Sequence, residues 1–451
     1  MKYTSINPYT GEEVLSIKGH SEKELQTILN RAGKSFDDWK DISLKERSRL
    51  MKEAGKVLEK NLDKYARLIC AEMGKPILEA RAEIKKCAWV CAYYADNAVD
   101  FLADEIIKTE AQKSFVRHDP IGCIFAVMPW NYPFWQVFRF AAPTLTAGNT
   151  AILKHAQNVF GCAREIEGVF REAGFPSGVF QSVYIGHDQT ESVISHAAVK
   201  AISLTGSERA GSSVAEIAGR HLKKSLLELG GSNAFIVLAD ADINEAVKTA
   251  VNARMMNAGQ SCIAAKRFII EEKVYDEFVD KFVKAVIELK SGNPTNEDTQ
   301  IGVLARIDLA EGVQKQVAQS IKKGAKLLLG GKHKGAYHEP TVLGDVKPGM
   351  AAFDEETFGP VAAMIKAKNL DEAYALSQQT IYALGVMVFT KNIDQALANA
   401  ARVKDGAYFI NEMVKSDPRL PFGGQGNSGF GRELSKDGMM EFINRKTVYV
   451  K

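Results

Sequence analysis

The feature that most constrains the fold is the regular alternation of short apolar runs with longer amphipathic segments from residue 121 onward. Apolar runs of about four to eight residues predict buried strands, whereas the longer segments repeat apolar residues at helical spacing. Strands that alternate with helices are typical of a parallel sheet covered by helices on both faces. The predicted strands of this first series are residues 121–128, 150–154, 179–185, 201–205 and 224–229. The sequence therefore predicts an α/β fold.

A second series of strands follows the pair Gly230 and Gly231. Its predicted strands are residues 234–238, 266–271, 361–366 and 385–389, again separated by helical segments. Before the first series, the predicted helices are residues 21–39, 43–73 and 76–101. The segments that alternate like strands at a sheet edge or a subunit interface are residues 113–119 and 447–450. We therefore expect two doubly wound α/β domains with a seam near residues 228–232.

Composition excludes several classes of function. The chain of 451 residues has a net charge of only +3 and no long run of Lys and Arg, which argues against a nucleic-acid partner. No stretch approaches 18 uninterrupted apolar residues, and the N-terminus has no apolar signal region, so neither a membrane span nor secretion is expected. Six cysteines are few for this length and point to a reducing cytoplasm. The eight histidines are scattered, so no metal site is predicted.

Three short segments carry candidate catalytic residues. Cys262 follows a glycine-containing turn, Gly259-Gln260-Ser261, in which backbone N–H groups favour a thiolate. Glu228 ends an apolar strand before two glycines, where a carboxylate can accept a proton or activate a water. Asn131, in Pro129-Trp130-Asn131-Tyr132-Pro133, can donate to a developing oxyanion. Taken singly, each has an ordinary alternative: a core cysteine, a salt-bridged glutamate and a turn asparagine.

Together, these segments resemble the aldehyde dehydrogenase superfamily over essentially the whole chain. The spacing of 34 residues from Glu228 to Cys262 is that of the family. Further matching segments are Leu204-Thr205-Gly206-Ser207, Glu355-Glu356-Thr357-Phe358-Gly359-Pro360 and Pro421-Phe422-Gly423-Gly424. The resemblance implies that Cys262 attacks an aldehyde and that Asn131 and the Cys262 N–H stabilise the oxyanion. Hydride then leaves for a nicotinamide, and Glu228 activates the water that hydrolyses the thioester.

The resemblance also implies a cofactor site, although no Gly-x-Gly-x-x-Gly fingerprint follows a strand. Gly206 and Ser207 would lie beside the pyrophosphate, and Lys154 would reach the adenosine ribose. Many NAD-preferring members carry a Glu three residues after that lysine, where this chain has Gln157. We therefore predict use of both NAD and NADP, with a preference for NADP. The other residues expected at the cofactor are Trp130, Thr205, Leu229, Glu356 and Phe358.

Within the superfamily, the chain looks most like the short bacterial succinate-semialdehyde dehydrogenases. Arg139, eight residues after Asn131, is predicted to face the substrate entrance and bind a distal carboxylate, although a structural ion pair is the alternative. Longer members carry an Arg where Met256 stands and can carry a second Cys where Ala264 stands, so no redox switch is expected. The remaining residues predicted to contact the substrate are Trp135, Ser261 and Arg419.

The resemblance divides the chain into three parts. Residues 1–112 and 124–228 would form a dinucleotide-binding domain and residues 229–425 a catalytic domain. Residues 113–123 and 426–451 would form a small β element for oligomerisation, which implies a homodimer or homotetramer. The alternatives are a dehydrogenase of other aliphatic or aromatic aldehydes, a CoA-acylating reductase and a non-catalytic binding protein. Glu228 argues against the reductase, because thioester-forming relatives need no activated water.

Overall fold

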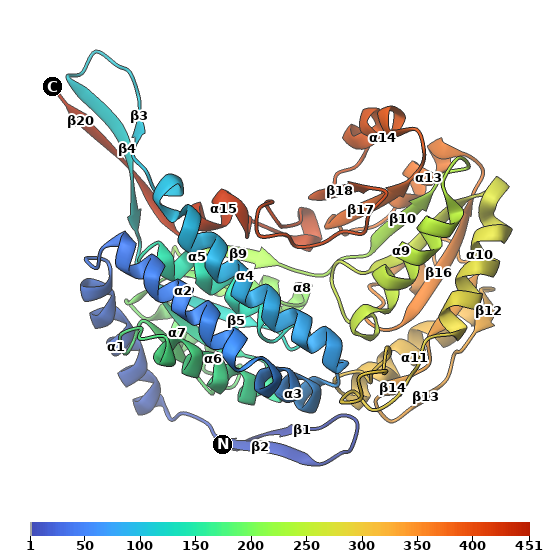
Figure 1. The fold of residues 1–451 in the computed structure, drawn as a ribbon, viewed down its shortest axis with the longest axis horizontal. Coiled ribbons are helices and arrows are strands. Elements are labelled where there is room, and N and C mark those ends of the chain that lie inside the picture. The colour runs from blue at the N-terminus through green and yellow to red at the C-terminus, as the bar shows by residue number, and fades with distance from the viewer. Residues whose placement is uncertain (1) are drawn as a thin grey trace.

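The computed structural model describes residues 2–451. Figure 1 shows two lobes, each built around one sheet, and a thin three-stranded sheet that projects beside the first lobe. Both large sheets consist mainly of parallel strands joined through helices, so the α/β prediction is confirmed. Among the described residues, no helix combines the length and the apolar character needed to cross a membrane.

The first lobe contains a six-stranded sheet. Its strands, in spatial order, are β19 (Gly429–Phe430), β9 (Lys224–Glu228), β8 (Val199–Thr205), β5 (Cys123–Met128), β6 (Thr150–His155) and β7 (Phe180–Ser182). All neighbours are parallel except β19, which runs antiparallel to β9. Successive side chains of β5 enter different cores, because strand residues alternate between the two faces.

Helices cover both faces of this sheet. One face carries α1 (Glu22–Trp39), α7 (Thr190–Ser195) and α8 (Glu208–Arg220). The other face carries a thicker layer made of α2 (Leu44–Lys60), α3 (Leu62–Met73), α4 (Ile77–Phe101), α5 (Trp135–Thr146) and α6 (Phe160–Glu172). The short 3-10 helix Gln157–Val159 joins β6 to α6. Burial of apolar residues on both faces explains why these strands read as nearly continuous apolar runs.

The second lobe contains a seven-stranded sheet. Its strands, in spatial order, are β12 (Lys326–Leu329), β15 (Thr341–Gly344), β16 (Val361–Ala367), β11 (Ala265–Glu271), β10 (Asn233–Val237), β17 (Gly385–Phe389) and β18 (Ala407–Ile410). Only β12 and β15 pair antiparallel. The helices of this lobe are α9 (Ile243–Met255), α10 (Glu272–Ile287), α11 (Ile307–Lys322), α12 (Ala351–Asp354), α13 (Leu370–Ser377) and α14 (Ile393–Asn399). Short 3-10 turns follow α9 at Met256–Gly259 and α14 at Ala400–Arg402.

Three smaller elements complete the fold. The projecting sheet pairs β4 (Lys113–Pro120) with β20 (Ile443–Val450) and with β3 (Glu105–Ile106). An N-terminal hairpin joins β1 (Lys2–Ile6) to β2 (Glu13–Lys18), and a second hairpin joins β13 (His333–Lys334) to β14 (Tyr337–His338). Near the C-terminus, a 3-10 turn (Gly426–Ser428) precedes β19, and α15 (Ser435–Met440) packs against α5.

The structure corrects several sequence predictions. The helix expected over residues 43–73 is interrupted at Asn61, whose side chain donates to the Val57 carbonyl oxygen at 3.0 Å. Asparagine competes with the helix through such local bonds. Residues 429–430, assigned from the sequence to the bridging element, instead pair with β9 in the first sheet. The pattern did not predict α11, β12, β15 or β18.

The order of strands in the first sheet creates the setting for a site. From β5 the chain moves outward through β6 and β7, then returns to the other side of β5 as β8. Adjacent parallel strands whose connections run in opposite directions leave a crevice at their carboxyl ends, where α/β folds bind ligands. Trp130 and Asn131 follow β5, and Gly206 and Ser207 follow β8. The candidate residues after these strands therefore meet at the same edge.

Candidate active site

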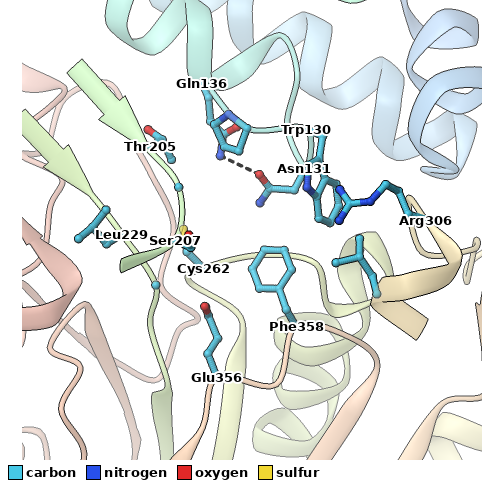
Figure 2. Close-up of a pocket in the computed structure, with 14 residues that line it drawn as sticks. Trp130, Asn131, Gln136, Thr205, Ser207, Leu229, Cys262, Arg306, Glu356 and Phe358 are labelled. Atoms are coloured by element: carbon cyan, nitrogen blue, oxygen red, sulfur yellow. Dashed lines mark hydrogen bonds between the residues drawn. The ribbon is translucent and has the colours of Figure 1, made fainter. Parts of the chain in front are cut away.

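A cavity of about 390 Å³ lies where the loops after β5, β8 and β9 meet the second lobe. In Figure 2, Cys262 lies beside Ser207, with the Phe358 ring next to it, Asn131 on the upper side and Glu356 below. We call this the first cavity. Its lining residues are Pro129, Trp130, Asn131, Gln136, Thr205, Gly206, Ser207, Leu229, Gly230, Cys262, Arg306, Leu309, Glu356 and Phe358. Cys262, Asn131 and most of the residues expected at the cofactor thus converge in space from segments far apart in the chain.

A second cavity, of about 270 Å³, lies on another side of the same cysteine. Its walls are mostly apolar, with several charged side chains among them. Its lining residues are Glu79, Ala82, Glu83, Lys86, Tyr132, Trp135, Gln136, Arg139, Met256, Ser261, Cys262, Ile263, Met413, Val414, Lys415, Ser416 and Phe422. Cys262 and Gln136 line both cavities. The thiol therefore stands where two separate molecules can approach it.

An unusual turn presents the Cys262 loop to these cavities. After α9, Asn257 and Ala258 have φ values of 53° and 49°, a region that non-glycine residues rarely occupy. The buried guanidinium of Arg254 holds the turn by donating to the carbonyl oxygens of Gly259 at 2.8 Å and Ala265 at 3.0 Å. Gly259 has a φ of 73°, and a Cβ there would collide with the Arg254 guanidinium. Only glycine fits this position of the loop.

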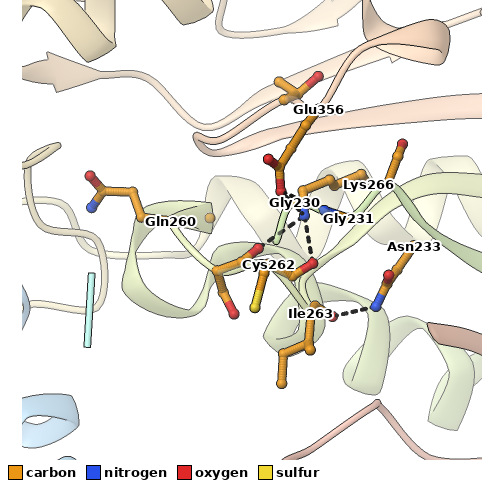
Figure 3. A network of polar contacts seen from close by, with 12 residues as sticks. Gly230, Gly231, Asn233, Gln260, Cys262, Ile263, Lys266 and Glu356 are labelled. Carbon is orange, nitrogen blue, oxygen red and sulfur yellow. Dashed lines mark hydrogen bonds and ion pairs between the residues drawn. The ribbon is translucent and has the colours of Figure 1, made fainter. Parts of the chain in front are cut away.

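A buried lysine fixes the backbone of the nucleophile candidate, as Figure 3 shows. The Lys266 ammonium donates to the carbonyl oxygens of Cys262 at 2.9 Å and Ser261 at 3.0 Å. It also pairs with the Glu356 carboxylate at 3.2 Å, and that carboxylate accepts the Gly231 N–H at 3.0 Å. This network ties the loop after β9 and the strand after Cys262 to Glu356, so the three segments hold one another in place.

Asn131 is held by its amide group. Gln136 Nε2 donates to Asn131 Oδ1 at 3.0 Å, and Asn131 Nδ2 donates to the Gln260 carbonyl oxygen at 3.1 Å. Asn257 in turn donates to the Asn131 carbonyl oxygen at 2.8 Å. Because a side-chain amide has two N–H groups, one Nδ2 hydrogen of Asn131 is left to donate into the first cavity. The rotamer of Asn131 is thus set by its neighbours.

The charges around Cys262 have opposite effects on the pKa of its thiol. Burial raises the pKa of the Cys262 thiol to about 11, while the positive charges of Arg139 and Lys266 act to lower it. The carboxylates of Glu356 and Glu228 add to the upward shift. The free thiol is therefore protonated at neutral pH in this arrangement, and its proton must leave when sulfur attacks a carbon.

Glu228 lines neither cavity. Its side chain is buried, and its Oε1 has no hydrogen-bond partner among the residues described. Burial is the main cause that raises the pKa of this carboxyl well above its usual range, and the nearby Glu433 carboxylate adds to it. A neutral, unpaired carboxyl near a thiol is an unusual core residue, because buried polar groups are normally hydrogen-bonded.

Arg139 lines the second cavity, but it does not face the entrance as an unpaired cation. Its side chain is only 3% exposed and forms an ion pair with the equally buried Glu433. Its guanidinium also donates to Thr205 Oγ1 at 3.3 Å and lies 4.6 Å from the centre of the Phe422 ring. These contacts agree with the alternative of a structural ion pair. Glu433 lies nearly 300 residues from Arg139 in the sequence, and only the fold brings the two together.

The other predicted residues divide between the site and its surroundings. Ser261 and Trp135 line the second cavity, and their contact with a substrate stays a prediction. Arg419 lines neither cavity: its side chain is 66% exposed and pairs with Asp417 at 2.7 Å. Lys154 is buried at the end of β6 and Gln157 is exposed just after it, so both lie at the carboxyl edge of the sheet, outside the two cavities.

Several residues of the site were not identified from the sequence. They are Lys86, Gln136, Arg254, Asn257, Lys266, Arg306 and Glu433. Gln136 and Lys266 lie within five residues of Asn131 and Cys262, so their proximity was a usable signal. Lys86 and Glu433 come from distant helices and loops, and no local pattern connects them with Cys262.

Comparison with known proteins agrees with this geometry. A protein of Synechocystis sp., named as a probable NADP(+) succinate-semialdehyde dehydrogenase, is 46% identical over 100% of both chains. The NAD(P)+ succinate semialdehyde dehydrogenase of Escherichia coli K12 is 44% identical over 99% of this chain and 97% of its own. The crystal structure of succinic semialdehyde dehydrogenase from Streptococcus pyogenes with NADP+ covers 99% of each chain at 36% identity and a TM-score of 0.97. The model of the aldehyde dehydrogenase family matches residues 1–448, and the chain therefore belongs to this family.

Proposed function

We propose that the protein oxidises succinate semialdehyde to succinate with NADP+ as the preferred hydride acceptor, through a covalent intermediate on Cys262. The observation that carries the proposal is the place of Cys262 between two cavities. One cavity suits a nucleotide cofactor and the other a small aldehyde. The reaction consumes the aldehyde, water and NADP+ and yields the carboxylic acid, NADPH and a proton. The names of the relatives support the same substrate and cofactor.

The residues of the first cavity fit a nicotinamide dinucleotide. Thr205, Gly206 and Ser207 line it at the N-terminus of α8, a 13-residue helix whose first N–H groups and dipole favour a phosphate. Glu356 offers carboxylate oxygens to ribose hydroxyls, and Phe358 offers an aromatic face. When bound, the oxidised cofactor supplies the hydride acceptor and a positive charge near the thiol.

Cys262 and Asn131 carry out the first stage. The Cys262 S–H bond breaks, with its proton passing to water, as the sulfur attacks the aldehyde carbon to form a C–S bond and the carbonyl π electrons move onto the oxygen as negative charge. Collapse of that oxyanion then breaks the aldehyde C–H bond, whose hydride would go to the oxidised nicotinamide, and leaves a thioester on Cys262. The free Asn131 Nδ2 hydrogen and the Cys262 backbone N–H stabilise that oxygen. Because Gln136 and Gln260 fix the Asn131 amide, the donor needs no reorganisation as the charge develops.

Glu228 serves the second stage, in which water hydrolyses the thioester and releases the Cys262 thiol. Since the carboxyl lines neither cavity, it acts as a base only after its side chain turns toward Cys262. Ionisation would accompany that turn, because leaving the buried site removes the cause that raises its pKa. A resting Glu228 that is neutral and withdrawn leaves space for the first stage.

The charges of two side chains at the carboxyl edge of the first sheet, Lys154 and Gln157, support a preference for NADP. Lys154 lies there as a buried cation, and Gln157 carries no charge that would repel a 2′-phosphate. A glutamate at position 157 would favour the free ribose hydroxyls of NAD. Lys86 and Arg139 both line the second cavity, and cationic side chains there suit an aldehyde with a distal carboxylate.

The experiment that tests the proposal is a spectrophotometric assay of NADPH and NADH formation with purified protein. The panel compares succinate semialdehyde with butanal and benzaldehyde, each with both cofactors. The proposal expects the highest kcat/KM for succinate semialdehyde with NADP+ and no turnover by Cys262→Ala. A higher kcat/KM for an uncharged aldehyde would favour the second candidate, a dehydrogenase of aliphatic or aromatic aldehydes. That candidate draws support from the mostly apolar walls of the second cavity.

We further propose that the protein acts in the cytoplasm as a homodimer or homotetramer. The three-stranded sheet supports this assembly, because β20 leaves one edge without a partner strand in the described chain. The free thiols of all six cysteines support a reducing compartment. Sedimentation equilibrium of the purified protein distinguishes the two assemblies from a monomer.

A further inference from the structure

The charged side chains of the second cavity differ in whether an acidic group already neutralises them. Arg139 is paired with Glu433, and Lys415 is paired with Glu412 at 2.6 Å. Lys86 is the exception: no carboxylate lies within ion-pair distance of its ammonium anywhere in residues 2–451. A half-buried cation without a counter-ion is costly in an apolar cavity, so a negatively charged ligand is expected beside it.

The position of Lys86 is nevertheless well defined. Its Nζ donates to Ser416 Oγ at 2.8 Å and lies 4.2 Å from the centre of the Trp135 ring. Trp135 Nε1 donates to the same Ser416 oxygen at 3.0 Å. An ammonium has three N–H donors, of which Ser416 takes one. Lys86 is therefore held in place with donors left for a ligand.

Acidic groups that line the same cavity do not take this role. Glu83 pairs with the buried Lys75 and accepts the backbone N–H groups of Phe134 at 2.8 Å and Trp135 at 3.0 Å. Glu79 accepts the Asn257 N–H at 2.7 Å, and burial raises the pKa of its carboxyl to about 7. Both carboxyls are engaged by neighbours on the inner side of α4, so the ammonium of Lys86 has no competing partner among them.

We propose that Lys86 is the specificity-determining residue that binds the distal carboxylate of the aldehyde, while the aldehyde carbon lies at Cys262. This inference rests on the proposed function and deepens it by naming the recognising charge. Lys86 and Cys262 line the same cavity, and the apolar wall of Trp135 and Phe422 suits the methylene groups between the two ends. Arg139 then acts mainly through Glu433 and Thr205 rather than as the first contact.

The state of the Lys86 ammonium agrees with this role. Burial, followed by the positive charge of Arg139, lowers its pKa to about 8 in the ligand-free protein. Cys87, Asp417 and Glu83 act in the opposite direction, but Asp417 and Glu83 form their ion pairs with Arg419 and Lys75. A carboxylate at hydrogen-bond distance favours the charged form and returns the pKa toward its ordinary value. Lysine thus gains an ionic partner from the substrate that the protein itself does not supply.

The test compares Lys86→Met, Lys86→Arg and the matched control Lys85→Met, whose lysine is the exposed neighbour on α4. KM and kcat are measured for succinate semialdehyde and for butanal, which has the same chain length without the carboxylate. Lys86→Met is expected to raise KM for succinate semialdehyde about ten- to a hundredfold, the range of a lost charge-assisted hydrogen bond. Its KM for butanal should stay within about twofold, Lys86→Arg should recover most of the loss, and Lys85→Met should resemble the unmodified protein.

A binding measurement separates recognition from catalysis. Calorimetric titration with succinate should give a Kd at least about tenfold weaker for Lys86→Met than for Lys85→Met. Equal increases of KM for both aldehydes would indicate a structural role and overturn the inference. If the unmodified protein prefers succinate semialdehyde but Lys86→Met has the same KM for it, the role of Lys86 is refuted and the proposed function stands. If the unmodified protein does not prefer succinate semialdehyde over butanal, both fail together.

Discussion

The buried side chains of Glu228, Arg139 and Glu433 predict how much folding stability the protein loses when Glu433 is replaced. Arg139 and Glu433 form an ion pair with 3% and 4% exposed side chains, and Glu228 lies near them as a neutral carboxyl. Removing one partner of such a pair costs about 3–5 kcal/mol when the other charge is left alone. In Glu433→Gln, however, Glu228 can ionise and become the new partner of Arg139. We therefore expect a loss of only about 1–3 kcal/mol at pH 8.

A double-mutant cycle tests this compensation. Glu228→Gln should cost less than about 0.5 kcal/mol, because it replaces a carboxyl that is already neutral. The double variant Glu228→Gln with Glu433→Gln leaves Arg139 without any anion and should lose about 3–5 kcal/mol. The sum of the single losses should thus fall short of the double loss. The measurement is the urea midpoint of each variant, converted through the slope of its unfolding curve.

The pKa of Glu228 determines how the destabilisation by Glu433→Gln changes with pH. The raised pKa of Glu228 means that the folded protein binds a proton that the unfolded chain releases above its ordinary pKa. Its neutral form thus supports stability fully below the unfolded pKa, and this contribution is lost as pH rises toward the folded pKa. In Glu433→Gln, Glu228 must ionise to compensate, so the destabilisation relative to the unmodified protein should be larger at pH 5 than at pH 8. Additive losses, or equal losses at both pH values, would refute the exchange of partners.

Three further predictions concern the site and its loop. Asn131→Ala should lower kcat about 10²- to 10³-fold through the lost oxyanion donor, and a loss below tenfold in steady-state kinetics would remove that role. Gln157→Glu should reduce kcat/KM with NADP+ by about tenfold and leave that with NAD unchanged or higher, whereas parallel changes with both cofactors would argue against repulsion of the 2′-phosphate. Gly259→Ala should destabilise the protein by about 2 kcal/mol or more because of its positive φ and the guanidinium beside it. Gly312→Ala in α11, where a Cβ meets nothing within 4 Å, is the matched control for thermal unfolding and should be neutral or stabilising.

Local sequence patterns were sufficient to predict the bounds of strands that lie inside a sheet covered on both faces. The strands β5, β6, β8 and β9 were predicted within about two residues, because burial on both faces requires continuous apolar runs. Several short elements were not predicted, whereas the strands β4 and β20 of the projecting sheet were predicted in whole or in part. The strand β18 is only partly buried, and the break at Asn61 depends on one side-chain hydrogen bond within an otherwise helical pattern.

The sequence by itself determined the α/β architecture and the family, together with the candidates Cys262, Asn131 and Glu228. Each of these rests on short-range patterns: apolar periodicity and motifs of a few residues. Only the tertiary structure decided how the charges are paired. In the folded protein, Arg139 forms an ion pair with Glu433, and Arg419 pairs with Asp417 outside both cavities. Lys86 lines the second cavity as a cation without a carboxylate partner. Ion pairing and desolvation depend on distances between residues far apart in the chain, which no local pattern encodes.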